Sequence, residues 1–293
     1  MLHSLSKRQN FKTSEGAFAI PFYFYQQHAR RSGASTLIAN LDPNSETLTE
    51  DLKAIRAKIK KAPIDIQLLK NVNQTIAASG YKRIRFRSST NAEDLEGFSG
   101  AGLYKSKTGM LNNPELPIDL AIKKVWASLW SEAAYLERSY YNINSQSVYM
   151  GILVHRSFPT EAVNGVAITK NLYRPENFGF VVNAQLGEMS VVNPDSGIIC
   201  DQFICYPAET GINLYSNKTI IDIITQSNLA DGDLVMSEAE IQRLANQLES
   251  IKRYFSVRSF LKSSYLDLGF DIEFKLDGPN RDLYIKQIRP YGN

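Results

Sequence analysis

The sequence of 293 residues contains few of the residue types that build metal centres and catalytic triads. It has two cysteines, Cys200 and Cys205, and no second pair that could complete a zinc site. We expect both to be free, buried thiols, because a reducing compartment disfavours a disulfide. The three histidines, His3, His28 and His155, lie in separate segments without the spacing of metal ligands. A histidine-based metal or catalytic centre is therefore not expected.

Two further absences limit the class of protein. No run of about 18 apolar residues is present, and the first ten residues lack the apolar core of a signal peptide. We therefore expect a cytoplasmic protein without a membrane partner. The net charge is only +3, and no block of lysine and arginine with interleaved aromatic residues occurs. A nucleic-acid partner is not expected either, since such binding needs a strongly basic surface.

The composition, with 43% apolar and 22% charged residues, is that of a soluble globular protein long enough for two lobes. We place these lobes at residues 1–190 and 191–293. Apolar spacing predicts helices over 48–62, 66–79, 116–140 and from 238 onward, the last after a capping box of Ser237 and Glu240. Alternating or continuous apolar runs predict strands at 83–87, 148–155, 165–169, 179–185 and 197–205, and a short strand leading into a helix within 17–25.

The last 25 residues predict a hairpin that gathers polar side chains. Apolar residues alternate with polar ones, so Asp271 and Glu273 share one face of the first strand. After an Asp-Gly-Pro-Asn turn, Gln287 and Arg289 share a face of the second strand and can approach the same point. Carboxylate and amide oxygens suit Mg²⁺, and an arginine fork suits phosphate. The hairpin is thus half of a metal-nucleotide site, or alternatively a solvated face with a loose ion pair.

A second cluster follows the strand that ends at Arg87. Ser88 and Ser89 come next, and a glycine-rich segment that includes Gly100 follows. Glycines let backbone N–H groups approach phosphate oxygens, hydroxyls add donors, and Arg87 supplies a permanently charged fork. This pattern predicts phosphate recognition.

Nearby charged residues have simpler explanations. Arg83 and Arg85 share the strand parity of Arg87, and a solvated strand face accounts for both. Glu93 and Asp94 could contact a metal ion, but carboxylates at this place more often begin a helix.

The residues from Arg87 to Leu95, with Phe98-Ser99-Gly100, resemble the Arg-Ser-Ser-x-x-x-Glu-Asp-Leu…Phe-x-Gly signature of one family. It is the ATP-binding domain of phosphoenolpyruvate synthase and pyruvate phosphate dikinase. Further pieces resemble that family in the same order along the chain: Ile20-Pro21-Phe22, Ala127-Ser128-Leu129-Trp130, Gly165-Val166-Ala167-Ile168-Thr169, Leu186-Gly187-Glu188 and Asp271-x-Glu273…Gln287-x-Arg289-Pro290.

The resemblance implies an α+β, ATP-grasp-like fold whose two lobes enclose a nucleotide cleft. It implies ATP and Mg²⁺ as cofactors and, as partner, a phospho-acceptor histidine on a separate domain, in a longer protein or in trans. The roles that it implies are catalysis by Arg289 and Arg87, which hold phosphates, nucleotide binding by Arg87, Ser88, Ser89, Gly100, Glu273, Gln287 and Arg289, and Mg²⁺ binding by Glu273, Gln287 and Asp271.

The sequence also departs from the family's pattern. The family has a Gly-Gly-Lys loop before its Val-Pro segment, whereas here about 19 residues precede Ile20 and no glycine pair precedes Lys7 or Lys12. A Thr-Ser-His-Ala acceptor motif and a stretch long enough for a pyruvate-binding barrel are also missing. Two readings stay open: a phosphotransferase domain that needs an acceptor elsewhere and is inactive in isolation, or a nucleotide-binding or structural module that lost the lysine loop.

Overall fold

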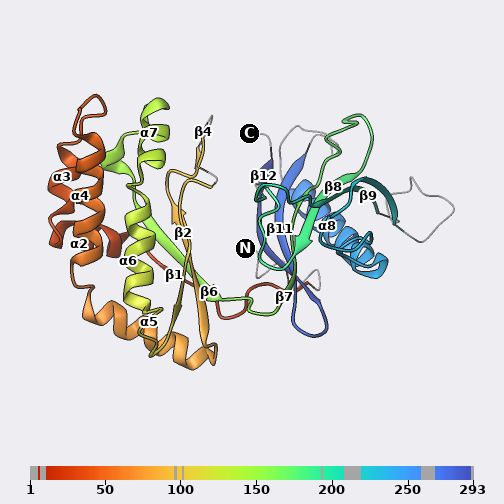
Figure 1. Cartoon of the computed structure of the whole chain (residues 1–293), viewed down its shortest axis with the longest axis horizontal. Coiled ribbons are helices and arrows are strands. Elements are labelled where there is room, and N and C mark those ends of the chain that lie inside the picture. The colour runs from red at the N-terminus through yellow and green to blue at the C-terminus, as the bar shows by residue number, and fades with distance from the viewer. Residues whose placement is uncertain are drawn as a thin grey trace. The chain divides into compact units, whose positions relative to one another are not determined.

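The chain folds into two compact units, which are described separately. The computed structural model describes residue 6 and residues 11–95, 98–100, 102–192, 194–207, 219–258 and 268–291. One unit, Glu15–Ser157, is called the helical unit here. The other, called the hairpin unit, combines Met1–Ser14 with Phe158–Asn293. Each unit contains both helices and an antiparallel sheet, so the fold class is α+β as predicted (Figure 1).

The predicted division at residues 190 and 191 falls inside the hairpin unit. Strands β7 (Glu161–Ile168) and β8 (Phe180–Leu186) precede that point, and β9 (Asp201–Tyr206) and β11 (Gly269–Asp277) follow it. These four strands are neighbours in one antiparallel sheet. Hydrogen bonds across this sheet join the segments before and after residue 190, so the chain divides near residue 157 instead.

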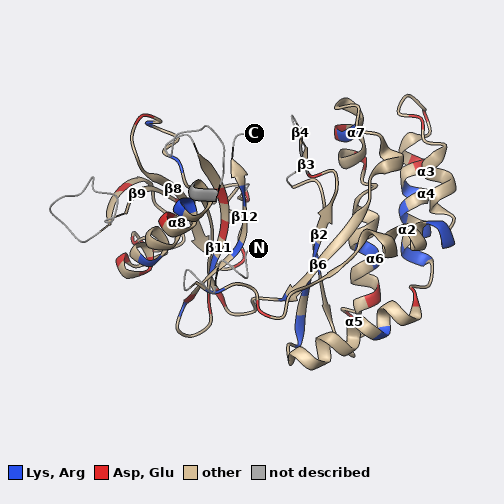
Figure 2. Cartoon of the chain, turned by 180° about the vertical axis from the view of Figure 1, so that it is seen from behind, with Lys and Arg blue, Asp and Glu red and all other residues tan. Residues whose placement is uncertain are grey.

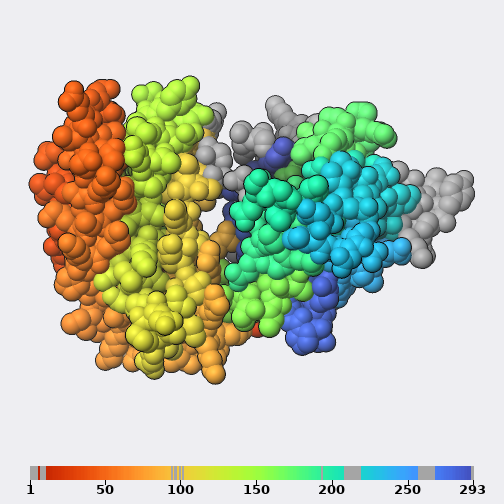
Figure 3. All heavy atoms as spheres, viewed as in Figure 1, coloured from red at the N-terminus to blue at the C-terminus, as the bar shows by residue number. Residues whose placement is uncertain are grey.

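The helical unit is a four-stranded antiparallel sheet covered by helices. The strand order is β1 (Phe18–Ile20), β6 (Met150–Arg156), β2 (Arg83–Thr90) and β5 (Lys107–Met110). Its helices are α2 (Phe22–Arg31), α3 (Ala34–Ala39), α4 (Leu48–Lys61), α5 (Ile66–Ser79), α6 (Ile118–Ser128) and α7 (Glu132–Tyr140), with a short 3₁₀ turn η1 (Ser145–Ser147). In the space-filling view, the red and orange atoms of α2 to α4 lie directly against the yellow-green atoms of α6 and α7 (Figure 3).

Local sequence signals explain where these helices begin and end. Asp65 accepts a hydrogen bond from Leu68 N at 2.8 Å as the N-cap of α5, and Gly80 ends that helix with φ 72°. The single helix predicted over 116–140 is wrong. Ser131 has an extended backbone, and its hydroxyl accepts from Ala134 N at 3.3 Å. It therefore starts a new helix, α7, three residues after α6 ends.

The hairpin unit is a six-stranded antiparallel sheet with one long helix. The order is β10 (Ile220–Thr225), β9, β8, β7, β11 and β12 (Asp282–Tyr291). The helix α8 (Glu238–Arg258) starts at the predicted capping box: Ser237 N donates to Glu240 Oε2 at 2.8 Å, and Glu240 N donates to Ser237 Oγ at 3.4 Å. The apolar side of α8 packs in the same core as Phe270, Ile272 and Phe274 of β11. No helix in the described ranges is both long and apolar enough to span a bilayer.

The two cysteines are free, as predicted, but they differ in burial. Cys205 is fully buried on β9, and this burial raises the pKa of its thiol to about 12. Cys200 is only half-buried, and burial raises the pKa of its thiol as well. A reagent must reach the sulfur to react, so the greater exposure favours Cys200.

We expect a thiol reagent at pH 8 to modify Cys200 first and to reach Cys205 only after unfolding. Mass spectrometry of peptides from native and urea-treated protein measures both rates. Equal labelling of the two residues in the native protein would contradict the burial seen for Cys205.

Candidate functional site

The closing hairpin forms as predicted, and its register brings the four predicted residues together. Asp271 lies directly opposite Arg289, and Glu273 directly opposite Gln287. The intervening apolar residues of β11 face the core beneath α8, so Asp271 and Glu273 lie on the other face of the sheet. Figure 2 shows the charged residues of this hairpin on β11 and β12.

A β-bulge determines which face the side chains of the second strand point to. Glu273 pairs with Gln287, but the next residue, Phe274, pairs with Ile285. Lys286 is therefore an extra residue in β12, and the alternation changes phase there. Both Gln287 and Lys286 consequently face Glu273, and the Lys286 ammonium donates to Glu273 Oε2 at 3.2 Å.

Arg289 holds Asp271 by two nitrogen contacts. Its Nε lies 2.8 Å and its Nη2 2.7 Å from Oδ2 of Asp271. The other oxygen of Asp271, Oδ1, is buried but accepts no hydrogen bond from the described residues. A buried carboxylate oxygen without a donor is costly unless a ligand satisfies it. This oxygen, the Glu273 carboxylate and the Gln287 amide form a donor set of oxygen atoms.

The donor set fits Mg²⁺ by its chemistry. Hard oxygen ligands suit Mg²⁺, which takes few protein ligands and keeps water or phosphate in its other positions. Within the described residues, no group of three or more histidine, cysteine or acidic side chains is arranged to hold a metal ion, so a site built by such side chains alone is not found there. Two carboxylates and one amide match an ion that also binds phosphate oxygens.

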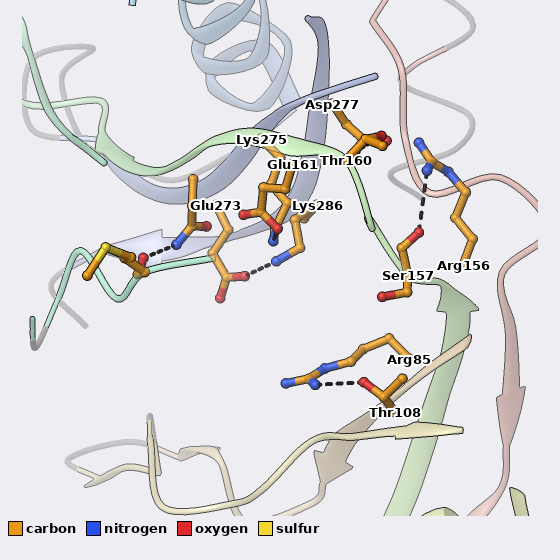
Figure 4. Close-up of polar contacts among 12 residues, drawn as sticks. Arg85, Thr108, Arg156, Ser157, Thr160, Glu161, Glu273, Lys275, Asp277 and Lys286 are labelled. Carbon is orange, nitrogen blue, oxygen red and sulfur yellow. Dashed lines mark hydrogen bonds and ion pairs between the residues drawn. The ribbon is translucent and has the colours of Figure 1, made fainter. Parts of the chain in front are cut away.

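A further ion pair lies beside these residues. Lys275 of β11 is paired with Glu161 of β7, whose side chain is almost fully buried, and the ammonium lies 5.6 Å from the ring centre of Phe158. Burial raises the pKa of Glu161, and the neighbouring ammonium of Lys275 opposes this rise. Figure 4 shows Lys275 close to Glu161 and the separate pair of Lys286 with Glu273.

The sequence reasoning did not identify three of these residues: Lys275, Lys286 and Glu161. Strand parity could have identified Lys275, because residues 271, 273 and 275 of β11 lie on the same face of the strand. No signal marks Lys286, since a bulge places it, or Glu161, since strand pairing brings it beside Lys275.

The serine segment lies at the end of β2 in the helical unit. Ile84 and Phe86 face the core, and Arg87 and Ser89 alternate with them toward the other face. Arg87 and Ser88 are half-buried and Ser89 is exposed.

The two neighbouring arginines differ from each other. Arg83 is exposed, as the solvated-face reading predicts. Arg85 is half-buried, and its Nη1 donates to Thr108 Oγ1 at 3.2 Å (Figure 4).

The described residues after Glu93 form two short paired strands, not a helix start. Strands β3 (Asp94–Leu95) and β4 (Phe98–Ser99) pair antiparallel, so the helix expected at Glu93 and Asp94 is wrong. Gly100 N donates to Glu93 O at 2.6 Å. A Cβ on Gly100 would lie 3.0 Å from Tyr104 Cε2, so the close approach of the backbone favours glycine. Gly97 and Ala101 of the predicted segment lie outside the described residues.

The predicted site residues thus fall into two sets. Arg87, Ser88, Ser89 and Gly100 belong to the helical unit, and Asp271, Glu273, Gln287 and Arg289 belong to the hairpin unit. Each set carries groups that suit phosphate or a metal ion. Side chains of this kind are typical of proteins that bind a nucleotide together with a divalent cation.

Comparison with known proteins defines the family. Residues 6–293 match the model described as "Pyruvate phosphate dikinase, AMP/ATP-binding domain", and the chain belongs to this family. The phosphoenolpyruvate synthase of Pyrococcus furiosus is 26% identical over 267 residues, which are 84% of this chain and 31% of that protein. An uncharacterized phosphotransferase of Bacillus subtilis, YvkC, is 30% identical over 218 residues, 72% of this chain and 24% of that protein.

The chain spans about a third of the length of the phosphoenolpyruvate synthases that it matches. Among solved structures, an N5-carboxyaminoimidazole synthetase from Staphylococcus aureus complexed with ADP aligns with 84% of this chain and 43% of its own. The identity is 16% and the TM-score 0.26, a similarity too weak to define the fold.

Proposed function

We propose that this chain binds Mg·ATP and transfers a phosphoryl group to a histidine on a separate domain. The observation that carries the proposal is the register of the closing hairpin, which sets Asp271 against Arg289 and Glu273 against Gln287. Membership of the AMP/ATP-binding family supports the nucleotide.

In this proposal each named residue has one task. Asp271, Glu273 and Gln287 would hold Mg²⁺, which neutralises phosphate charge when it is bound. Arg289 and Arg87 would hold phosphate oxygens, because an arginine fork donates two parallel hydrogen bonds. Phosphoryl transfer depends mainly on positioning and on charge stabilisation, and metal ligands and arginines are the types of residue that provide both.

Ser88, Ser89 and Gly100 complete the proposed nucleotide site. The hydroxyl groups would donate to phosphate oxygens, and Ser89 is exposed in the described unit. Gly100 is buried and its N–H donates to Glu93 O, so we propose that its role is to shape the backbone after β4.

One observation favours a second function. Asp271 and Glu273 are already paired with Arg289 and Lys286, and ion pairs of this kind can also serve only to stabilise a hairpin. The alternative is a module that binds nucleotide without turnover, or that has a structural role alone.

Two measurements on the whole chain separate these functions. Calorimetry with ATP and Mg²⁺ is expected to show saturable binding, and transfer of labelled phosphate to an added histidine-bearing acceptor domain is expected to follow. Binding without transfer would indicate the non-catalytic module. Absence of binding at millimolar Mg·ATP would refute both nucleotide functions and leave the structural one.

A further inference from the structure

Lys286 has no role in the proposed site, yet its ammonium contacts a carboxylate of that site. The bulge in β12 places its ammonium 3.2 Å from Glu273 Oε2, on the carboxylate proposed to bind Mg²⁺. Its side chain is 14% exposed, and its charge also acts on the buried carboxylate of Glu161. Bulges commonly redirect one side chain next to an active site.

Three ion pairs lie on this face of the hairpin unit. Three carboxylates are paired with three cations, in the pairs Asp271 with Arg289, Glu273 with Lys286 and Glu161 with Lys275. A bound Mg²⁺ would add two positive charges beside Glu273. Because the cation and the ammonium repel each other at this range, the ammonium would move from Glu273 toward another anion.

The nucleotide provides that anion. A nearly buried ammonium favours an anionic partner, and the phosphate oxygens of a bound nucleotide would be acceptors for it. Lysine has three donors on a flexible stem, so its ammonium can move between acceptors without a change in the backbone.

We propose that Lys286 is a phosphate-binding residue that changes partner. Its ammonium pairs with Glu273 when no nucleotide is bound and donates to a phosphate oxygen when ATP binds. Mg²⁺ favours this change by taking the carboxylate but is not required for it. The proposal rests on the proposed function and adds a cationic residue to it. Lys275 keeps its own partner, because Glu161 is far more buried than Glu273.

The test compares the wild-type chain with Lys286→Met, and Lys12→Met serves as a matched control. Lys12 is a lysine of the same unit, also paired with a carboxylate, Asp282, but exposed. Calorimetry measures the affinity for Mg·ATP, for ATP with EDTA and for adenosine, and circular dichroism checks folding. We expect Lys286→Met to weaken both forms of ATP at least about tenfold, since a charge-assisted hydrogen bond contributes that much. Adenosine affinity and the Lys12→Met affinities are expected to stay unchanged.

Metal-free ATP separates a phosphate contact from a structural role. If Lys286 only orients Glu273, Lys286→Met lowers the affinity for Mg·ATP and leaves metal-free ATP unaffected, which overturns the proposal. Unchanged affinity for both forms also overturns it, while the proposed function stands. If the wild-type chain binds no ATP, the proposed function fails first and this inference with it.

A second pair of variants covers a loss of folding. In Glu273→Gln/Lys286→Met, no carboxylate is left without its cation, so this variant is compared with Glu273→Gln alone. The loss of affinity for metal-free ATP on removal of Lys286 is expected to persist in this background. Equal affinities of the two variants would overturn the proposal.

Discussion

Replacing Glu273 with glutamine is expected to weaken the binding of Mg·ATP about 100-fold, which is about 2.7 kcal/mol. Glutamine keeps the size of the side chain but removes the negative charge that pairs with Lys286 and that we propose as a metal ligand. The Mg²⁺ concentration needed for half-maximal binding should rise as well. Calorimetry over a series of Mg²⁺ concentrations measures both changes.

The same variant should not weaken ATP in the absence of metal. Without the Glu273 carboxylate, Lys286 keeps its charge for phosphate, so metal-free ATP should bind at least as well as in the wild type. Arg289→Ala should instead weaken both forms, because its guanidinium is proposed to contact phosphate directly. Asp282→Asn, which changes a half-buried carboxylate on the same strand, is the control and should have no effect. An unchanged Mg²⁺ requirement in Glu273→Gln would remove this residue from the metal site.

The hairpin shows how much of the site the sequence could predict. Alternation correctly predicted that Asp271 and Glu273 share a face, and the turn correctly predicted that β12 returns beside β11. Strict alternation would also place Gln287 on the core face with Ile285, because both numbers are odd. The bulge at Lys286 reverses the phase and turns Gln287 toward Glu273. A bulge is a property of pairing between two strands, so one strand's pattern cannot reveal it.

Helix boundaries show a similar limit. The periodic apolar residues of α6 and α7 continue across Leu129 to Ser131, so the pattern favours one helix. In the structure α6 ends at Ser128, and the Ser131 hydroxyl accepts from Ala134 N as the cap of the next helix. A local side-chain cap overrides periodicity in this case.

The division of the chain was harder to predict for a topological reason. The hairpin unit contains residues from both ends of the sequence: Lys12 bridges to Tyr284, and Ile285 N donates to Lys12 O at 2.9 Å. A reading along the chain assumes that each lobe is one continuous segment. It therefore cannot assign the first residues to the same unit as the last strand.

Gly165 is the position where a small substitution should have the largest effect on stability. It lies on β7 opposite Phe274 of β11, and the Phe274 ring covers it in the fully buried core. A Cβ at this position would lie 2.1 Å from Phe274 Cζ and 2.4 Å from Cε1. These distances are shorter than any non-bonded contact between carbon atoms, so the ring would have to move. The motif Gly165–Thr169 therefore begins with glycine because the Phe274 ring leaves no room for a Cβ.

We expect Gly165→Ala to destabilise the protein by about 3 kcal/mol, the upper end of the usual cost of overpacking. Urea denaturation followed by circular dichroism measures the free energy of unfolding. Phe274→Leu is the matched second change, since it removes the ring atoms that meet the new methyl group. The double variant Gly165→Ala/Phe274→Leu should therefore be more stable than Gly165→Ala alone.

The outcome also bears on the site, because Phe274 follows Glu273 at the bulge. If the ring is displaced, the strand that carries Glu273 moves with it. Gly165→Ala should then weaken Mg·ATP even where the protein is still folded, and the double variant should regain part of the affinity. If the free energy of unfolding of Gly165→Ala lies within about 0.5 kcal/mol of the wild type, the core accommodates the added methyl group without strain, which would contradict this prediction.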